Sequence, residues 1–287
     1  MTFMIETILV PIDFTIESKE LLSCVGEFKN TGLKKVILLH VVDIFQAQGL
    51  APMFEENANK KIRDYKQLLD EMGVDAITFV IQGDVRKTIV RVANEENVDC
   101  IVMGATTSGV VKGRLIGRTT EYISRMSGKI VLIEKYDTLR ESEKESYIKA
   151  CSAKFSKVMI PVDLPGISGI LLKEITNLKD IIDELVFVHV VESAKDSEEL
   201  ENKKKQSMNF LSGMGNAFEN GLKVSYYISE GKPAEVIDRL AEEMDVTLIA
   251  ITTHRIGSFK DILMGSTAES LLRRTRKPLL LIPAGKR

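Results

Sequence analysis

The chain has 287 residues, with 39 basic against 41 acidic side chains and 44% hydrophobic residues. This length fits two domains that each bury a core of their own. The balanced charge gives no field that would attract nucleic acid or an acidic membrane, and no apolar run approaches the ~20 residues of a membrane-spanning helix. The first residues lead into a strand pattern without a signal-type segment. We therefore expect a cytoplasmic protein that binds neither nucleic acid nor membrane.

Strand and helix patterns alternate along the first half of the chain. The expected strands are short apolar runs, as in a sheet covered on both faces, at 8–11, 36–42, 76–81, 100–103 and 130–133. The expected helices carry apolar residues at helical spacing, at 16–30, 56–72, 84–96 and 119–127. Strands joined by helical crossovers require a parallel sheet with helices on both faces.

The segment between the second strand and its helix, residues 43–55, is unusually apolar for a loop. It carries Phe45, Leu50, Met53 and Phe54. These side chains could cap a ligand, or they could pack in a core or against the other half of the chain. Packing is the favoured interpretation, because large exposed apolar patches are uncommon on soluble proteins.

The pattern of the first half returns in the second half. Asp13 and Asp163 both follow a Val/Ile-Pro-Ile/Val strand and lie 150 residues apart (163 − 13), while Gly117 and Gly265 lie 148 apart (265 − 117). This spacing is typical of a whole domain copied in tandem. We predict an α/β protein of two tandem domains, 1–136 and 156–287, joined by a charged connector at 137–155. Each domain is expected to hold a five-stranded parallel sheet with helices on both faces.

The expected topology places a binding site at the carboxyl ends of the first and fourth strands. In open α/β sheets, ligands bind where the strand order reverses. In the first half this position falls on Asp13 and Gly104, and in the second half on Asp163 and Thr252. A carboxylate after the first strand can accept hydrogen bonds from a ribose or an adenine amine, or it can cap the next helix.

A second motif follows the fourth strand in each half. A loop of fixed length leads to Gly-Arg-Thr-Thr-Glu at 117–121, or Gly-Ser-Thr-Ala-Glu at 265–269, and then to a helix. Glycine allows a ligand to approach the backbone, and the hydroxyls and free amides at a helix start suit a phosphate. The same residue types can form an ordinary capping box. The motif alone leaves the helix cap and the phosphate site open.

Both halves resemble the universal stress protein domain along nearly their whole length. The resemblance rests on the Pro-x-Asp of the first strand, the His-Val-Val of the second, Gly-Lys-Pro-Ala-Glu-Val-Ile at 231–237, and the glycine motif before the last helix. The stretch 265–274 with 278–283 is the most specific part. The resemblance implies a Rossmann-like, nucleotide-binding α/β hydrolase-type fold.

The adenine-nucleotide binders of this family share a loop written G-x-x-G, nine residues, then G-(S/T), and the first half keeps part of it. Gly104 and Gly117 hold the outer positions, 13 residues apart (117 − 104). Thr107 replaces the inner glycine, and Arg118 replaces the final Ser/Thr. A hydroxyl can also meet phosphate, and a guanidinium can either pair with phosphate or fill the pocket.

The second half keeps the other part of the loop. Gly265 and Ser266 are intact, while Thr252 and Arg255 replace the first two glycines. Because each half carries an incomplete motif, a short phosphate chain as in AMP is an alternative to ATP.

Carried over by position, the resemblance implies that the aspartate and a valine backbone hold the adenosine, while the loop and helix start hold phosphates. The implied residues of the first half are Pro11, Asp13, Val41, Met103, Gly104, Thr106, Thr107, Gly117, Arg118, Thr119 and Thr120. Those of the second half are Pro161, Asp163, Val190, Ile251, Thr252, His254, Arg255, Gly265, Ser266 and Thr267. His254 is interpreted either as a phosphate contact or as an ordinary polar loop residue. His40 and His189 precede buried valines and are predicted to be hydrogen-bonded structural residues.

The leading functional hypothesis is a stress-response or regulatory protein that binds AMP or ATP, with Mg²⁺ as the accompanying ion, and is not an enzyme. The alternative is a dimerising scaffold that binds no nucleotide, suggested by the incomplete glycine loops. Slow nucleotide hydrolysis is a third hypothesis, for which the sequence offers no identified general base. The resemblance also implies that strands 130–133 and 279–282 pair, which forms a pseudo-dimer within one chain and leaves room for a homodimer between chains.

Overall fold

The computed structural model describes residues 5–106, 116–136, 153–163, 169–216, 218, 221–255 and 262–283. Thr107 and most of the connector 137–155 therefore lie outside the described residues. Within the described part of the chain, no helix is long and apolar enough to cross a membrane.

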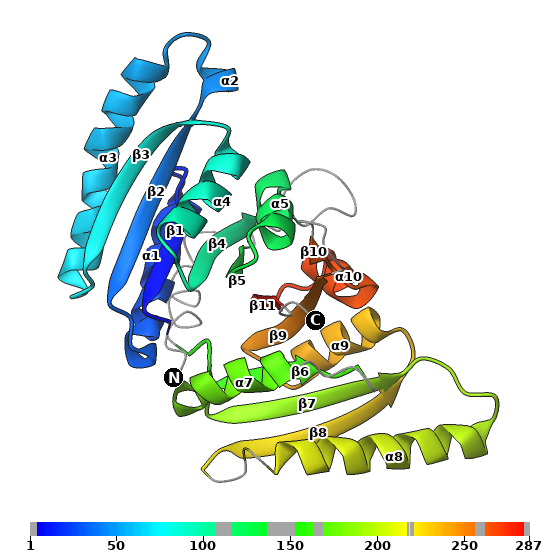
Figure 1. The fold of residues 1–287 in the computed structure, drawn as a ribbon. Coiled ribbons are helices and arrows are strands. Elements are labelled where there is room, and N and C mark those ends of the chain that lie inside the picture. The colour runs from blue at the N-terminus through cyan, green and yellow to red at the C-terminus, as the bar shows by residue number, and fades with distance from the viewer. Residues whose placement is uncertain are drawn as a thin grey trace.

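The first half alternates strands and helices in the predicted order. Its strands are β1 (Thr7–Pro11), β2 (Lys35–Asp43), β3 (Ala76–Gly83), β4 (Cys100–Thr106) and β5 (Ile130–Tyr136). Its helices are α1 (Ile16–Val25), the 3₁₀ helix η1 (Gly26–Thr31), α2 (Ile44–Ala47), α3 (Ala51–Glu71), α4 (Val85–Glu95) and α5 (Arg118–Met126). In Figure 1, α1 and α3 cover one face of the strands, while α4 and α5 cover the other.

The second half repeats this order. Its strands are β6 (Lys157–Pro161), β7 (Glu184–Val191), β8 (Lys223–Glu230), β9 (Leu248–Arg255), β10 (Ile262–Leu263) and β11 (Leu279–Pro283). Its helices are α7 (Gly169–Leu178), the 3₁₀ helix η3 (Lys179–Ile181), α8 (Ser197–Gly215), α9 (Pro233–Glu243) and α10 (Ser266–Arg274). The short strand β10, which pairs antiparallel with the end of β9, was not predicted.

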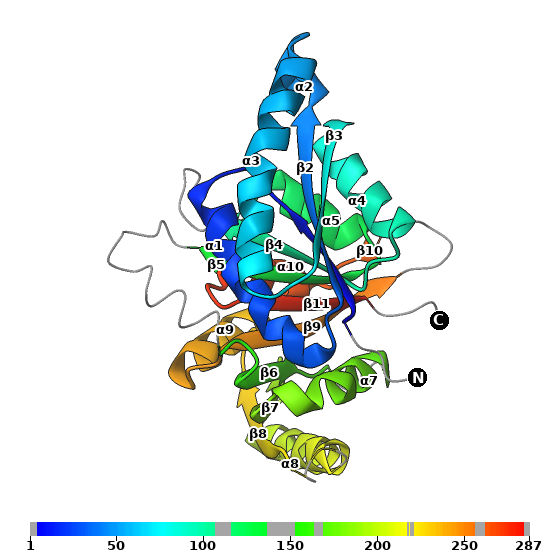
Figure 2. The ribbon, with the colours of Figure 1, turned by 90° about the vertical axis from the view of Figure 1, so that its left-hand side faces the viewer.

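The strands of the two halves form one sheet in the order β3-β2-β1-β4-β5-β11-β9-β6-β7-β8. Apart from the short β9–β10 contact, the pairs within each half are parallel, as predicted. The halves meet where β5 and β11 pair antiparallel, with Leu132 opposite Leu280. The predicted pairing of the fifth strands is confirmed. Figure 2 shows α2 and α3 at one end of the molecule and α8 at the other.

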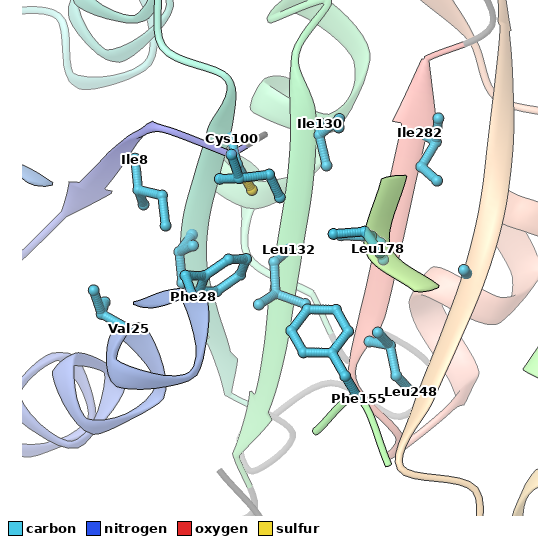
Figure 3. Close-up of a cluster of buried hydrophobic side chains, with 14 of the residues drawn as sticks. Ile8, Val25, Phe28, Cys100, Ile130, Leu132, Phe155, Leu178, Leu248 and Ile282 are labelled. Carbon is cyan, nitrogen blue, oxygen red and sulfur yellow. The ribbon is translucent and has the colours of Figure 1, made fainter. Parts of the chain in front are cut away.

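The hydrophobic core continues across the seam between the halves. One buried cluster contains Leu132 of β5 together with Leu248 and Ile282 of the second half. In Figure 3, Phe28 and Phe155 lie on either side of Leu132, and their rings meet edge to face with centroids 5.6 Å apart. Because both halves contribute to the same buried cluster, burial of apolar surface holds them together along the seam.

A group of buried charges lies beside this seam. Lys154 forms an ion pair with Glu134, and both side chains are almost fully buried. The backbone amide of Lys154 also donates to the Glu27 carboxylate at 2.9 Å. Burial raises the pKa of Glu27 to about 7, and the neighbouring Lys154 only partly offsets this shift. These groups tie η1 and β5 to the segment that leads into the second half.

Two expectations for the apolar segment 43–55 are wrong. It is helical rather than a loop, because α2 fills its start and α3 begins at Ala51, five residues before the predicted position. Its large apolar side chains also pack neither in the core nor against the other half. Phe45 is 74% exposed and Leu50 52% exposed, and Met53 and Phe54 are exposed as well. Asp43 caps α2 by accepting from the Phe45 amide, so a local hydrogen bond sets the helix start.

Candidate functional site

A cavity of about 850 Å³ opens at the carboxyl ends of β1, β2 and β4 in the first half. This is where the strand order reverses between β1 and its neighbours β2 and β4. The cavity is lined by these residues of the predicted site: Pro11, Asp13, Val41, Met103, Gly104, Gly117, Thr119 and Thr120. Arg118 is exposed in the first turn of α5 and does not line it. Thr106 is the last residue of β4, and Thr107 lies outside the described residues.

The aspartate after β1 does not cap the following helix. Thr15 is the cap, since its hydroxyl accepts from the Ser18 amide at 3.2 Å. Asp13 supports Thr15 instead, and its Oδ1 accepts from the Thr15 amide at 3.1 Å and from the Thr15 hydroxyl at 2.6 Å. Asp13 is itself exposed at the cavity, so the other carboxylate oxygen remains available to a ligand that donates hydrogen bonds.

Phe14 holds a strained position in the cavity wall. Its φ is 62°, a left-handed value that bulky residues rarely adopt and that costs on the order of 1 kcal/mol. The ring stacks on His40 with centroids 4.3 Å apart and meets Tyr65 edge-on at 5.5 Å. The Tyr65 hydroxyl donates to the Thr15 carbonyl at 3.2 Å. The strained backbone is therefore held by ring contacts on both sides.

His40 and His189 are structural residues, as predicted. The Nδ1 of His40 lies 2.9 Å from the Ile12 carbonyl, and the Nδ1 of His189 lies 2.9 Å from the Val162 carbonyl. Each ring thus ties the end of the second strand of its half to the residue after the first strand. Burial lowers the pKa of His40, which keeps this ring neutral near pH 7.

Helix α5 begins at the cavity without a side-chain cap. Its first flanking residue is Gly117, which has no side chain to bond the free amides of the first turn. The φ of Gly117 is −72°, which any residue can adopt, and a Cβ placed there would meet nothing within 4 Å. The fold itself therefore does not require glycine at this position. The open space and the free amides suit an anionic group at the positive end of the helix.

The capping-box interpretation is wrong for both glycine motifs, because their glutamates bond elsewhere. Glu121 of α5 pairs with Arg273 of α10 at 2.6 Å, and Glu269 of α10 pairs with Arg125 of α5 at 3.0 Å. Each arginine also lies near the glutamate of its own helix, at 3.2 and 3.6 Å. The four charges form a two-fold-like network that joins the two helices across the seam.

The second half places its predicted residues at the corresponding positions. Pro161 ends β6, Asp163 is exposed just beyond it, and Val190 and Ile251 are buried in β7 and β9. Helix α10 again begins after an uncapped glycine, Gly265, with Ser266 and Thr267 in its first turn.

The loop expected after the fourth strand starts later than predicted in the second half. Thr252, His254 and Arg255 belong to β9, where Thr252 pairs with Ile282 of β11, and His254 and Arg255 pair with β10. The strand is longer than predicted because β10 and β11 both supply partners for its backbone groups. In the first half β4 likewise runs on to Thr106 against β5.

Phe54 lines the cavity, in line with the ligand-capping alternative for segment 43–55. Sequence reasoning missed the rest of the wall that α2 and α3 provide, where Ala47, Asn57, Ala58 and Lys61 line the cavity. No motif marks them, because the sheet and its crossovers bring them beside the strand ends only after folding. Within the described residues, no group of three or more His, Cys, Asp or Glu side chains is placed to hold a metal ion.

The fold and the cavity define a tandem α/β protein with a ligand-sized site at the carboxyl ends of its first-half strands. The chain belongs to the universal stress protein family, whose family model matches residues 4–135 and 154–283.

Known proteins similar to this chain agree with that membership. The universal stress protein MJ0577 of Methanocaldococcus jannaschii is 30% identical over 158 residues, which cover 47% of this chain and 98% of that protein. The crystal structure of a universal stress protein from Archaeoglobus fulgidus has a TM-score of 0.74 and 22% identity, and covers 99% of this chain and 100% of its own. A functionally unknown protein, PA1789 from Pseudomonas aeruginosa, has a TM-score of 0.69 and 19% identity, covering 98% of this chain and 93% of its own. These two structural likenesses concern the fold.

Proposed function

We propose that this protein is a stress-response or regulatory protein that binds an adenine nucleotide, AMP or ATP, in the cavity of its first half. The observation that carries the proposal is the cavity of about 850 Å³ into which Asp13 and the uncapped start of α5 both face. Membership of the universal stress protein family supports it. In this proposal the protein acts in the cytoplasm by binding the nucleotide and does not catalyse a reaction. In keeping with this, His40 and His189 each have Nδ1 beside a backbone carbonyl rather than beside a nucleophile.

The cavity residues suggest a role for each end of the nucleotide. The unbonded oxygen of Asp13 would accept from a ribose hydroxyl or the adenine amine, with the backbone of Val41 beside the base. The first-turn amides of α5 and the hydroxyl of Thr119 would hold phosphate, and Mg²⁺ would be held mainly by the phosphates themselves. One helix start matches a single phosphate well, which makes AMP a ligand to test beside ATP.

The first test is to denature protein purified without added nucleotide and identify the released small molecules by mass spectrometry. Nucleotide-free protein is then titrated with AMP and with ATP, each with and without Mg²⁺, by calorimetry. A bound or released adenine nucleotide is the expected result. A protein that releases none and shows no heat with either ligand would overturn the proposal.

A matched pair of glycine variants locates the site. Gly117→Val fills open space at the start of α5, whereas Gly213→Val places the same side chain at an exposed and equally open position on α8. We expect Gly117→Val to weaken nucleotide binding by about tenfold or more, equivalent to about 1.4 kcal/mol, and Gly213→Val to leave it unchanged. Equal affinities of the two variants would place the nucleotide elsewhere.

One observation favours the scaffold alternative, in which two copies associate. Ile44, Phe45, Leu50 and Met53 are exposed together on α2 and at the start of α3, and clustered apolar surface of this kind marks interaction sites. Sedimentation velocity over a range of concentrations tests it. The alternative is supported if the protein is a dimer that Phe45→Ser dissociates. The control is Phe210→Ser, which removes an exposed phenylalanine on α8 and should leave the dimer intact. A monomer at every concentration would dispose of it.

A further inference from the structure

The first-half cavity extends over both faces of the sheet. Successive side chains of a strand point to opposite faces, and β2 shows this at its carboxyl end. Val41 belongs to the core cluster that contains Ile89 of α4, whereas Val42 packs with Ala47 and Ala58 of α2 and α3. All of these residues line the one cavity. We call the space beside α4 and α5 the α5 lobe, and the space beside α2 and α3 the α3 lobe.

The predicted nucleotide site belongs to the α5 lobe. Met103 of that site lies in the same core cluster as Val41 and Ile89, on the α4 and α5 face, and Gly117 and Thr119 lie at the start of α5. None of the residues implied for nucleotide binding comes from α2 or α3. The α3 lobe is therefore cavity space that the nucleotide proposal leaves unassigned.

The α3 lobe has apolar side chains along much of its wall, polar ones at Asp43, Gln46 and Asn57, and, within the described residues, a single side-chain ammonium. Its wall includes Val42, Ala47 and Ala58, whose small side chains leave room, together with the rings of Phe14 and Phe54. The Nζ atom of Lys61 lies 5.6 Å from the Phe14 ring centroid. Within the described part of the chain Lys61 makes no ion pair, unlike its neighbour Lys60, which pairs with Glu56 at 2.7 Å.

Among the described charged and titratable groups that line the cavity, Lys61 is the one that carries a positive charge near pH 7. His40 is held neutral by burial, which lowers its pKa. Glu17 also lines the cavity, but it lies in the first turn of α1 and forms no ion pair with Lys61 among the described residues. Asp13 and Asp43 also line the cavity, and each has one carboxylate oxygen engaged, by Thr15 and by the Phe45 amide respectively.

We propose that the α3 lobe binds a small amphipathic carboxylate, with its apolar chain beside Val42, Ala47 and Ala58 and its carboxylate on Lys61. The apolar wall would bury the chain, with roughly 25 cal/mol gained per Å² removed from water. One ammonium matches one negative charge, whereas a phosphate group calls for several donors. This site is separate from the proposed nucleotide site, and neither depends on the other.

Octanoate is the probe, with 1-octanol as its uncharged counterpart, and binding is followed by titration with detection by NMR. Wild-type protein is expected to bind octanoate more tightly than octanol. Lys61→Met should weaken octanoate binding by about three- to fivefold, as for an exposed ion pair, and leave octanol binding unchanged. The matched control Lys60→Met removes an exposed lysine one residue away and should leave both affinities unchanged.

Two further measurements place the probe in the lobe. Ala58→Leu fills the lobe from α3 and should weaken octanoate and octanol alike, with a thermal unfolding curve confirming that the variant folds. Octanoate should remain bound when AMP is added. Displacement of octanoate by AMP would place the probe in the α5 lobe and overturn the proposal. Undetectable octanoate binding would also overturn it, and so would equal effects of the Lys60 and Lys61 variants on octanoate affinity. A protein that binds octanoate but no nucleotide would refute the proposed function and leave this site standing.

Discussion

At the scale of single residues, the fold keeps a carboxyl group in a place that disfavours its charge. Glu27 has one carboxylate oxygen that is buried and lacks a hydrogen-bond partner. Burial raises the pKa of Glu27 to about 7. The nearby Lys154 lowers this pKa in part, and the negative charge of Glu134 raises it further. Because the folded protein binds this proton more tightly than the unfolded chain, the stability that the group provides is complete below about pH 4.5 and is lost as the pH rises through about 7.

Replacing the Glu27 carboxyl should prevent the loss of stability at high pH. Glu27→Gln keeps an oxygen to accept from the Lys154 amide and carries no titrating charge. At pH 8 we expect the variant to be more stable than the wild type by about 1–2 kcal/mol, a value reduced from the full shift because the side chain is only partly buried. Urea unfolding at pH 4.5 and pH 8 measures this. The advantage should vanish at pH 4.5, and the control Glu20→Gln, on α1, should show no such pH dependence. An unchanged stability at pH 8 would mean that Glu27 titrates normally.

The residues of the α5 lobe could be predicted, and apart from Phe54 those of the α3 lobe could not, for a physical reason. Asp13, Gly104 and Gly117 stand at strand ends and a helix start, where residue type and position in the chain already indicate a site. Lys61 and Ala58 lie in the middle of α3, and nothing in their local sequence differs from an ordinary helix face. Their role depends on how α3 packs beside β2, which is a tertiary contact.

At the scale of secondary-structure elements, the apolar periodicity predicted most strands and helices within a few residues. It failed for segment 43–55, whose apolar residues have no regular spacing. There α2 begins at the Asp43 cap, and α3 begins with a proline in its first turn and no side-chain cap. The periodicity also shortened β4 and β9. Gly104 is of a residue type depleted in strands, and Thr252 holds the corresponding position, while the backbone groups of both are paired in the sheet. Element ends depend on partners that periodicity does not show.

Helices α5 and α10 allow a direct measurement of how the elements of the two halves are coupled. Glu121 and Arg273 lie 2.6 Å apart across the seam and are partly exposed. In a double-mutant cycle with Glu121→Gln and Arg273→Met, we expect a coupling energy of about 0.5–1 kcal/mol, because partly exposed pairs are screened by water. The coupling should shrink in about 1 M salt. The parallel cycle on Arg239 and Glu243, within α9, is a control that reports no contact between halves. A coupling near zero in low salt would show that the network does not hold the helices together.

At the scale of the whole molecule, the tandem repeat predicted the two halves, and the family resemblance predicted the strands through which they meet. The repeat could not predict that the halves share a buried core. The second half has a polar segment, Glu-Ser-Ala-Lys-Asp at 192–196, at the position corresponding to the apolar α2 of the first half. Two copies of one fold therefore present different surfaces at corresponding ends of the sheet.

The shared core predicts that the two halves unfold together. Leu280 of β11 is fully buried, pairs with Leu132 of β5 and belongs to the cluster that also holds Ile8 and Val10 of β1. Leu280→Ala should cost about 2–5 kcal/mol. If the sheet unfolds as one unit, native-state hydrogen exchange should show β1 in the first half losing as much protection as β6 in the second. Protection lost in β6 alone, with β1 unchanged, would mean that the halves are independent units joined only at an edge. The outcome also bears on function, since a cooperative sheet would allow a ligand bound in the first-half cavity to stabilise the second half as well.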